Sequence, residues 1–147
     1  MEVKEILKNL REKNNLTQEQ MAQRVNITRQ AISRWETGET QPDTQMLKVL
    51  SKEFDVSINT LLGSPQQLFC QCCGMPLSED SMISKDNDGQ FNEDYCKWCY
   101  SEGTFAYKTK DSLLDYLVTH MPNPENQSET EKRKLFDYHL SQLKHWR

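Results

Sequence analysis

The sequence contains no long apolar run, no excess of positive charge and no cysteine before residue 70. A helix that crosses a bilayer needs roughly 18 or more consecutive apolar residues. No segment approaches that length, so we expect no membrane partner. The first five residues are mostly charged and lack the apolar stretch of a secretory signal. Together these absences predict a cytoplasmic protein.

The charge balance excludes proteins that coat nucleic acid through a strongly positive surface. The formal net charge is −4, and residues 1–65 hold nine Lys or Arg and nine Asp or Glu. Residues 66–147 hold nine and 13, so the negative excess lies wholly in the second half. If the first half binds DNA, its cations must therefore be placed locally.

Familiar catalytic motifs are also missing. The sequence has no G-x-x-x-x-G-K-[ST] phosphate-binding loop, no G-x-S-x-G nucleophile turn and no H-E-x-x-H metalloprotease helix. We therefore predict that the protein is not an enzyme.

The character of the sequence changes after residue 63, which predicts two small domains. Residues 1–63 have helical periodicity, and the polar, proline-containing composition of 64–68 is typical of a linker. Residues 69–107 are rich in Cys, Gly, Asp, Asn and aromatic residues, whereas 108–147 return to helical periodicity. We divide the chain at these positions.

Residues 3–62 predict five helices and hardly any strand. The i, i+3, i+4, i+7 spacing of one apolar helix face is met by Val3, Ile6, Leu7 and Leu10. The second and third helices are predicted to begin at the capping residues Thr17 and Thr28, the fourth at Pro42-Asp43 and the short fifth at Ser57. Thr17 and Gln20 predict a capping box, and Gly38 suits the left-handed residue that ends the helix begun at Thr28.

The predicted helix at 28–37 has one apolar and one polar face. Ala31, Ile32 and Trp35 face the core. The opposite face carries Arg29, Gln30, Ser33, Arg34 and Thr37. Because an arginine offers two donors to a guanine, and Gln or Ser can pair with other base edges, this polar face suits the major groove of DNA. For an isolated helix, an ordinary solvated face is the alternative interpretation.

Longer strings identify the first domain more specifically. Residues 16–25 (LTQEQMAQRV) and 28–36 (TRQAISRWE), with Gly38 and Pro42-Asp43, resemble the Xre family of Cro-like and phage-repressor-like helix-turn-helix regulators. The resemblance implies a five-helix domain whose third helix enters the major groove of double-stranded DNA. It implies that Gln18 contacts a phosphate. The other implied DNA-binding residues are Thr28, Arg29, Gln30, Ser33 and Arg34.

The same resemblance implies an ion pair between Arg11 and Glu36, which we expect to fix helix docking without touching DNA. The domain is formally neutral and each half-site adds few phosphate contacts, so we expect a monomer to bind weakly. We therefore predict a homodimer on a palindromic operator.

All five cysteines lie within 30 residues, which in a cytosolic chain favours metal binding over disulfides. Cys70-x2-Cys73 and Cys96-x2-Cys99, separated by 22 residues, predict four thiolates around a structural Zn²⁺. Cys72 is left over, and Cys70-x-Cys72 is a less favoured first pair. A thiol redox enzyme is the rival use of these residues, but its βαβ setting is missing and it leaves the second pair unexplained.

A second resemblance covers residues 69–147. The strings at 70–77 (CQCCGMPL), 92–100 (NEDYCKWCY) and 103–105 (GTF) are similar to a small zinc-ribbon family. That family ends in a helical region closing with Leu-Lys-x-Trp, which is Leu143 to Trp146 here. It has a residue other than cysteine at the position of Cys72, which implies that Cys72 is not a ligand.

Two further helices are predicted at 110–121 and 128–146, the second with a capping box from Ser128 and Glu131. We interpret the Lys132-Arg133-Lys134 triplet as a solvated helix face and the aromatic residues of 95–107 as a small core around the metal rather than a base-stacking surface. The three histidines, His120, His139 and His145, are interpreted as surface or groove residues. The helix pair packs on the ribbon or on a second subunit.

The sequence thus predicts a mainly α protein: a five-helix helix-turn-helix domain, then a small four-cysteine zinc ribbon and a C-terminal helix pair. We predict a sequence-specific, DNA-binding transcription regulator, with repression expected, whose zinc module serves assembly or regulation. The alternative is a zinc-stabilised protein-interaction adaptor that the first domain tethers to DNA.

Overall fold

The computed structural model describes residues 1–63 and 65–147, which divide into two compact units. The first comprises Met1–Gln66 with Gly89–Phe91, and the second Gln67–Asp88 with Asn92–Arg147. Ser64, where the predicted linker 64–68 begins, lies outside the described residues. Within the described part of the chain, no helix is long and apolar enough to cross a membrane.

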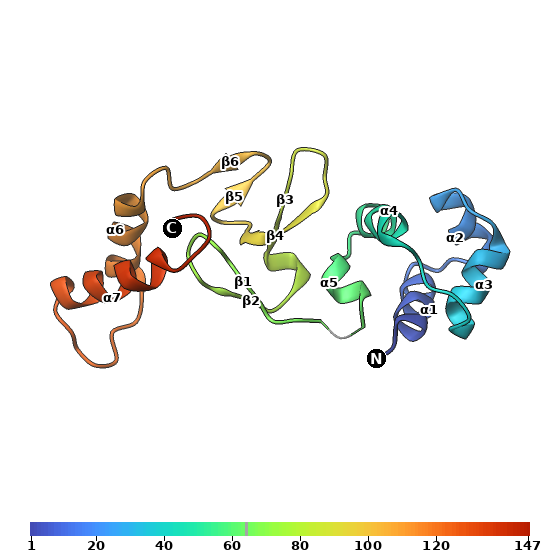
Figure 1. Cartoon of the computed structure of the whole chain (residues 1–147), viewed down its shortest axis with the longest axis horizontal. Helices are drawn as coiled ribbons and strands as arrows, with labels where there is room; N and C mark the ends of the chain where they lie inside the picture. The colour runs from blue at the N-terminus through green and yellow to red at the C-terminus, as the bar shows by residue number, and fades with distance from the viewer. Residues whose placement is uncertain (64) are drawn as a thin grey trace. The chain divides into compact units, whose positions relative to one another are not determined.

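The first unit is helical, as predicted. It contains α1 (Val3–Lys13), α2 (Gln18–Val25), α3 (Arg29–Thr37), α4 (Thr44–Phe54) and α5 (Ile58–Leu61) (Figure 1). The capping box is confirmed, because Thr17 Oγ1 accepts from the Gln20 amide at 3.1 Å and Gln20 Oε1 accepts from the Thr17 amide at 2.9 Å. Gly38 ends α3 with φ 82°, a left-handed conformation that glycine adopts without strain.

A continuous apolar core holds these helices together. Its buried members are Leu7, Met21, Ala22, Val25, Ile32, Trp35, Leu50, Phe54 and Leu61. The ion pair between Arg11 and Glu36 lies at the edge of this core, with Arg11 Nη2 at 2.8 Å from Glu36 Oε1 and Arg11 Nε at 2.9 Å from Oε2.

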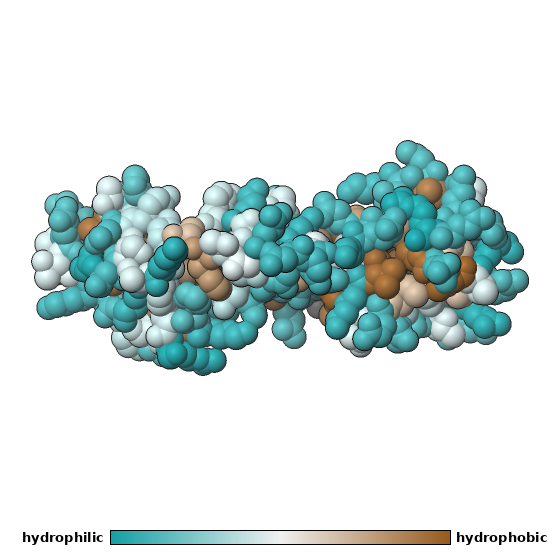
Figure 2. Space-filling view, turned by 90° about the horizontal axis from the view of Figure 1, so that it is seen from above, coloured by the Kyte–Doolittle hydropathy of each residue, from teal (hydrophilic) through white to brown (hydrophobic). Residues whose placement is uncertain are grey.

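The face seen in Figure 2 is mostly hydrophilic, with a hydrophobic patch over the first unit.

The second unit begins with short strands around the two cysteine pairs. The strands are β1 (Leu68–Phe69), β2 (Pro76–Leu77), β3 (Ile83–Lys85), β4 (Phe91–Cys96), β5 (Tyr100–Ser101) and β6 (Thr104–Phe105), with a 3-10 turn at Asp80–Met82. They pair as β1-β2, β3-β4 and β5-β6. The first and last pairs are antiparallel, with Leu68 opposite Leu77 and Tyr100 opposite Phe105.

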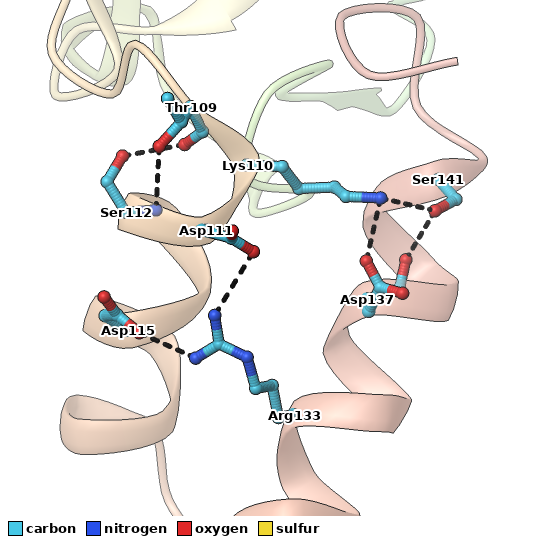
Figure 3. Close-up of polar contacts among 8 residues, drawn as sticks. All are labelled: Thr109, Lys110, Asp111, Ser112, Asp115, Arg133, Asp137 and Ser141. Atoms are coloured by element: carbon cyan, nitrogen blue, oxygen red, sulfur yellow. Dashed lines mark hydrogen bonds and ion pairs between the residues drawn. The ribbon is translucent and has the colours of Figure 1, made fainter.

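Helices α6 (Lys110–His120) and α7 (Glu129–Ser141) complete the second unit. Polar contacts join them: Arg133 bonds Asp115 at 2.6 Å and Asp111 at 3.3 Å, and Lys110 lies 2.8 Å from Asp137 (Figure 3). Leu113, Leu114 and Leu117 of α6 and Leu140 of α7 are buried.

Two predictions for this region are wrong. The helix predicted at 128–146 ends at Ser141, and donors of residues 144–146 bond Gln71 and Cys72 instead of continuing it. Lys132, predicted to be solvated, is only 8% exposed. Its Nζ donates to the Val118 and Met121 carbonyls at 2.8 and 3.3 Å, where the end of α6 leaves acceptors without helical partners.

Candidate metal centre and nucleic-acid interface

The four cysteines predicted as zinc ligands come together in the second unit. One sulfur from each of Cys70, Cys73, Cys96 and Cys99 lies within 4.8 Å of all the others. The Cys73 and Cys96 sulfurs are 3.9 Å apart. Cys70, Cys96 and Cys99 are buried and Cys73 is half-buried. Four converging thiols from two C-x2-C turns are the donor set of a closed, structural zinc site.

The turn at the first cysteine pair forms at the tip of the β1-β2 hairpin. The Cys70 amide donates to the Met75 carbonyl at 2.9 Å, and the Gly74 amide donates to the Cys70 carbonyl at 2.8 Å. Gly74 has φ 82°, so a residue with a side chain would be strained there. The sequence therefore closes a tight turn that directs Cys70 and Cys73 to one point.

The turn at the second pair joins β4 to β5. Cys96 is the last residue of β4, and the Cys99 amide donates to the Cys96 carbonyl at 3.2 Å. The Ala106 amide, just after β6, donates to the Cys99 carbonyl at 2.8 Å. The strand and this contact hold Cys96 and Cys99 toward the first pair.

The Cys70 sulfur accepts hydrogen bonds that favour its charged form. The backbone amides of Cys72 and Cys73 donate to Cys70 Sγ at 3.4 and 3.5 Å. The pKa of Cys70 lies far below its usual range, chiefly because its sulfur accepts hydrogen bonds from the thiols of Cys73, Cys96 and Cys99. The pKa of Cys99 is raised, first by its hydrogen bond with Cys70. Zinc would replace the protons that these thiols share, because metal binding requires thiolates.

Cys72 does not belong to the four-sulfur group. Its side chain is fully buried, as is common for a free cysteine that packs as a small hydrophobic residue. The cluster also favours Cys70-x2-Cys73 over the Cys70-x-Cys72 alternative.

Aromatic rings pack beside the metal centre, in line with the predicted small core. The Tyr95 ring lies 4.9 Å from the Phe105 ring, and the Tyr100 ring lies 4.8 Å from it. Trp98 departs from this pattern, because it is 55% exposed and lies beside Lys97. His145 joins the cluster, with its ring 4.3 Å from Phe105. The sequence analysis interpreted His145 as a surface or groove residue and missed this contact. The neighbouring Leu-Lys-x-Trp string was the one available sign that the end of the chain packs on the ribbon.

The polar face of α3 lies on the surface of the first unit. Ile32 and Trp35 are buried, whereas Arg29, Gln30 and Arg34 are exposed. Ser33 is half-buried on α3, Gln18 is half-buried as the first residue of α2, and Thr28 Oγ1 accepts the Ala31 amide at 3.2 Å as the helix cap. The left-handed Asn26, with φ 63°, ends α2 and turns the chain into α3.

Sequence comparisons support both units. The family described as "Putative zinc ribbon domain" matches residues 69–147, and the family "Helix-turn-helix" matches residues 7–61. The HTH-type transcriptional regulator YqaE of Bacillus subtilis is 32% identical over 92 residues, which are 61% of this chain and 79% of that protein. The HTH-type transcriptional activator BcrR of Enterococcus faecalis is 46% identical over 66 residues, which are 45% of this chain.

The matched segment spans only 32% of BcrR. A solved transcriptional regulator from Listeria innocua is similar over 96% of this chain and 94% of its own, with 18% identity and a TM-score of 0.42. The two matched families define a helix-turn-helix protein with a zinc-ribbon domain. The chain belongs to the Xre-like helix-turn-helix transcriptional regulators, and its second unit belongs to the zinc-ribbon family, with structural zinc at the cysteine cluster.

Proposed function

We propose that the five-helix domain at 1–63 binds a specific sequence of double-stranded DNA by inserting α3 into the major groove. The observation that carries this proposal is the division of α3 between buried Ile32 and Trp35 and exposed Arg29, Gln30 and Arg34. The buried side fixes the helix to the core, so the exposed donors are held in place before DNA arrives. Ser33 and Thr28 complete the proposed contact surface, and Gln18 is its phosphate contact.

The charge of the domain bears on how strongly it binds. With nine cations and nine anions, residues 1–65 are formally neutral, so we expect few phosphate contacts from one copy of the domain. A homodimer on a palindromic operator doubles these contacts and offsets the weak binding of one copy. If such an operator overlaps a promoter, binding would repress transcription. We also propose that the protein acts in the cytoplasm.

We further propose that the second unit serves assembly or regulation, with the ribbon at 69–107 followed by the helix pair at 108–147. Exposed hydrophobic side chains on the helix pair support this role. Tyr138 is 65% exposed, and Tyr116 and Leu135 are also exposed. Exposed aromatic and aliphatic residues of this kind are common at protein interfaces.

The test is selection of preferred sites from a random DNA pool with the full-length chain. Arg29→Ala should relax base preference at one position in each half-site, because it removes a base contact. Gln18→Ala should weaken binding to all sequences alike, because it removes a phosphate contact. An unaltered preferred site for Arg29→Ala would contradict the proposed role of Arg29, and sites without two-fold symmetry would contradict the palindrome.

A further inference from the structure

Residues 142–147 dock on the turn that carries the first two zinc ligands. The His145 amide donates to the Gln71 carbonyl at 3.1 Å. The Trp146 indole Nε1 donates to the Cys72 carbonyl at 2.7 Å. The Lys144 amide donates to Gln71 Oε1 at 3.1 Å. The two backbone carbonyls between Cys70 and Cys73 are therefore both held by this segment.

Those two carbonyls share peptide planes with the amides that face the Cys70 sulfur. The Gln71 carbonyl and the Cys72 amide form one peptide unit, and the Cys72 carbonyl and the Cys73 amide form the next. Both peptides are trans, so the carbonyl and amide of each point in opposite directions. A donor that fixes the carbonyl on one side therefore aims the amide at Cys70 Sγ on the other.

We propose that His145 and Trp146 are positioning residues of the zinc site. The His145 amide orients the Cys72 amide, and the Trp146 indole orients the Cys73 amide, so that both donate to Cys70 Sγ. Each hydrogen bond to a carbonyl also polarises its peptide and strengthens the amide-to-sulfur bond beyond it. Groups beyond the ligands commonly set the metal affinity of a site in this way.

Further contacts keep the segment in register with the turn. The Lys144 ammonium lies 2.7 Å from Asp94, and the His145 ring packs against Phe105. Leu143 packs over the same turn, because a Cβ added to Gly74 would lie 3.6 Å from Leu143 Cδ1, an ordinary van der Waals distance. By linkage, zinc binding should in turn order residues 142–147. This inference rests on the zinc centre and not on the proposed DNA contacts.

The test compares Trp146→Phe with Trp98→Phe in the full-length chain. Phenylalanine keeps an aromatic ring and removes the indole donor, and Trp98 is the exposed tryptophan of the second cysteine turn. Competition with a chromophoric chelator should show about tenfold lower zinc affinity for Trp146→Phe. Trp98→Phe should match the wild type. Equal affinities for all three chains would overturn the proposal.

A second measurement separates positioning from a general loss of structure. In the wild-type chain loaded with NMR-active cadmium, the Cys72 and Cys73 amide protons should both show scalar coupling to the metal through Cys70 Sγ. Trp146→Phe should weaken the Cys73 coupling and spare that of Cys72, whose peptide the His145 amide still holds. Absence of both couplings in the wild type, or equal loss of both in the variant, would overturn the proposal.

Discussion

The two units of the chain are stabilised in different ways. The helix-turn-helix unit has nine buried hydrophobic residues in one continuous core and no cysteine. Among residues 69–107, all of which are described, the buried hydrophobic residues other than cysteines are Leu77 and Ile83. The burial of large side chains stabilises the first unit, whereas the ribbon has too few of them to offset its ordering entropy. The ribbon therefore depends on its metal.

Zinc removal should produce the largest effect and should be confined to one unit. Structural zinc contributes on the order of 10 kcal/mol to the folding of small domains. A chelator added to the zinc-loaded chain should therefore abolish the dispersed amide NMR signals of 69–107 and leave those of α1–α5 in place. An unchanged ribbon spectrum after zinc removal would show that the metal does not hold the ribbon together.

Two serine variants provide the matched control for this prediction. Cys96→Ser removes one member of the four-sulfur cluster and should abolish stoichiometric zinc binding. Cys72→Ser changes the one cysteine outside the cluster and should keep one zinc per chain. Equal zinc contents for the two variants, measured by atomic absorption, would contradict the ligand assignment.

Leu50→Ala should have the converse effect, because Leu50 is fully buried in the core of the first unit. Leu-to-Ala changes in protein cores cost about 3 kcal/mol, through lost burial and the cavity that remains. Chemical denaturation followed at the helices should show this loss while zinc content stays at the wild-type value. Val49→Ala, at the exposed neighbouring position, should cost much less. Loss of zinc from Leu50→Ala would show that the two units do not fold separately.

A smaller effect should come from the ion pairs of the first unit. The Arg11 and Glu36 side chains are 14% and 6% exposed, and the hydrogen bonding of the guanidinium to the Glu36 carboxylate is the chief reason that the pKa of Arg11 is raised. Glu36→Ala leaves the guanidinium partly buried without its carboxylate, which should cost about 2 kcal/mol in a denaturation measurement.

The pair between Arg24 and Glu53 is the control for Glu36→Ala. Its side chains are 40% and 41% exposed, so Glu53→Ala should cost less than about 1 kcal/mol. The double variant Arg11→Met/Glu36→Leu should regain much of the stability lost in Glu36→Ala, because no buried charge is left unpaired. Equal costs for Glu36→Ala and Glu53→Ala would mean that burial does not distinguish the two pairs.

Features that depend on residues close in sequence were predictable. The predicted caps at Thr17 and Thr28 are confirmed, because each accepts from an amide three residues on. The helix starts predicted at Asp43 and Ser57 are also confirmed, and both residues cap their helices in the same way. The zinc cluster was predictable for the same reason, since each C-x2-C pair forms one turn. The ion pair between Arg11 and Glu36 joins distant positions, and only the family resemblance predicted it. The DNA-contacting residues stay a prediction.

Features that depend on distant parts of the chain were missed. The apolar stripe at 128–146 fits a continuous helix, yet the helix ends at Ser141 and residues 144–146 bond Gln71 and Cys72. Local periodicity cannot show that these hydrogen bonds form in place of further helical ones, because the acceptors lie about 70 residues earlier in the sequence. The burial of Lys132 was missed for a related reason, since its carbonyl acceptors, Val118 and Met121, lie at the end of α6 and just after it.

Lys132 gives the smallest effect and tests whether polar contacts stabilise the second unit alongside its metal. Lys132→Met keeps most of the aliphatic stem and removes the ammonium that bonds the Val118 and Met121 carbonyls. We expect a loss of about 1 kcal/mol in the zinc-loaded chain, with faster amide exchange at the end of α6. Lys134→Met changes an exposed lysine of the same triplet and should be nearly neutral. If both variants cost the same, the buried ammonium of Lys132 contributes nothing to stability beyond its aliphatic stem.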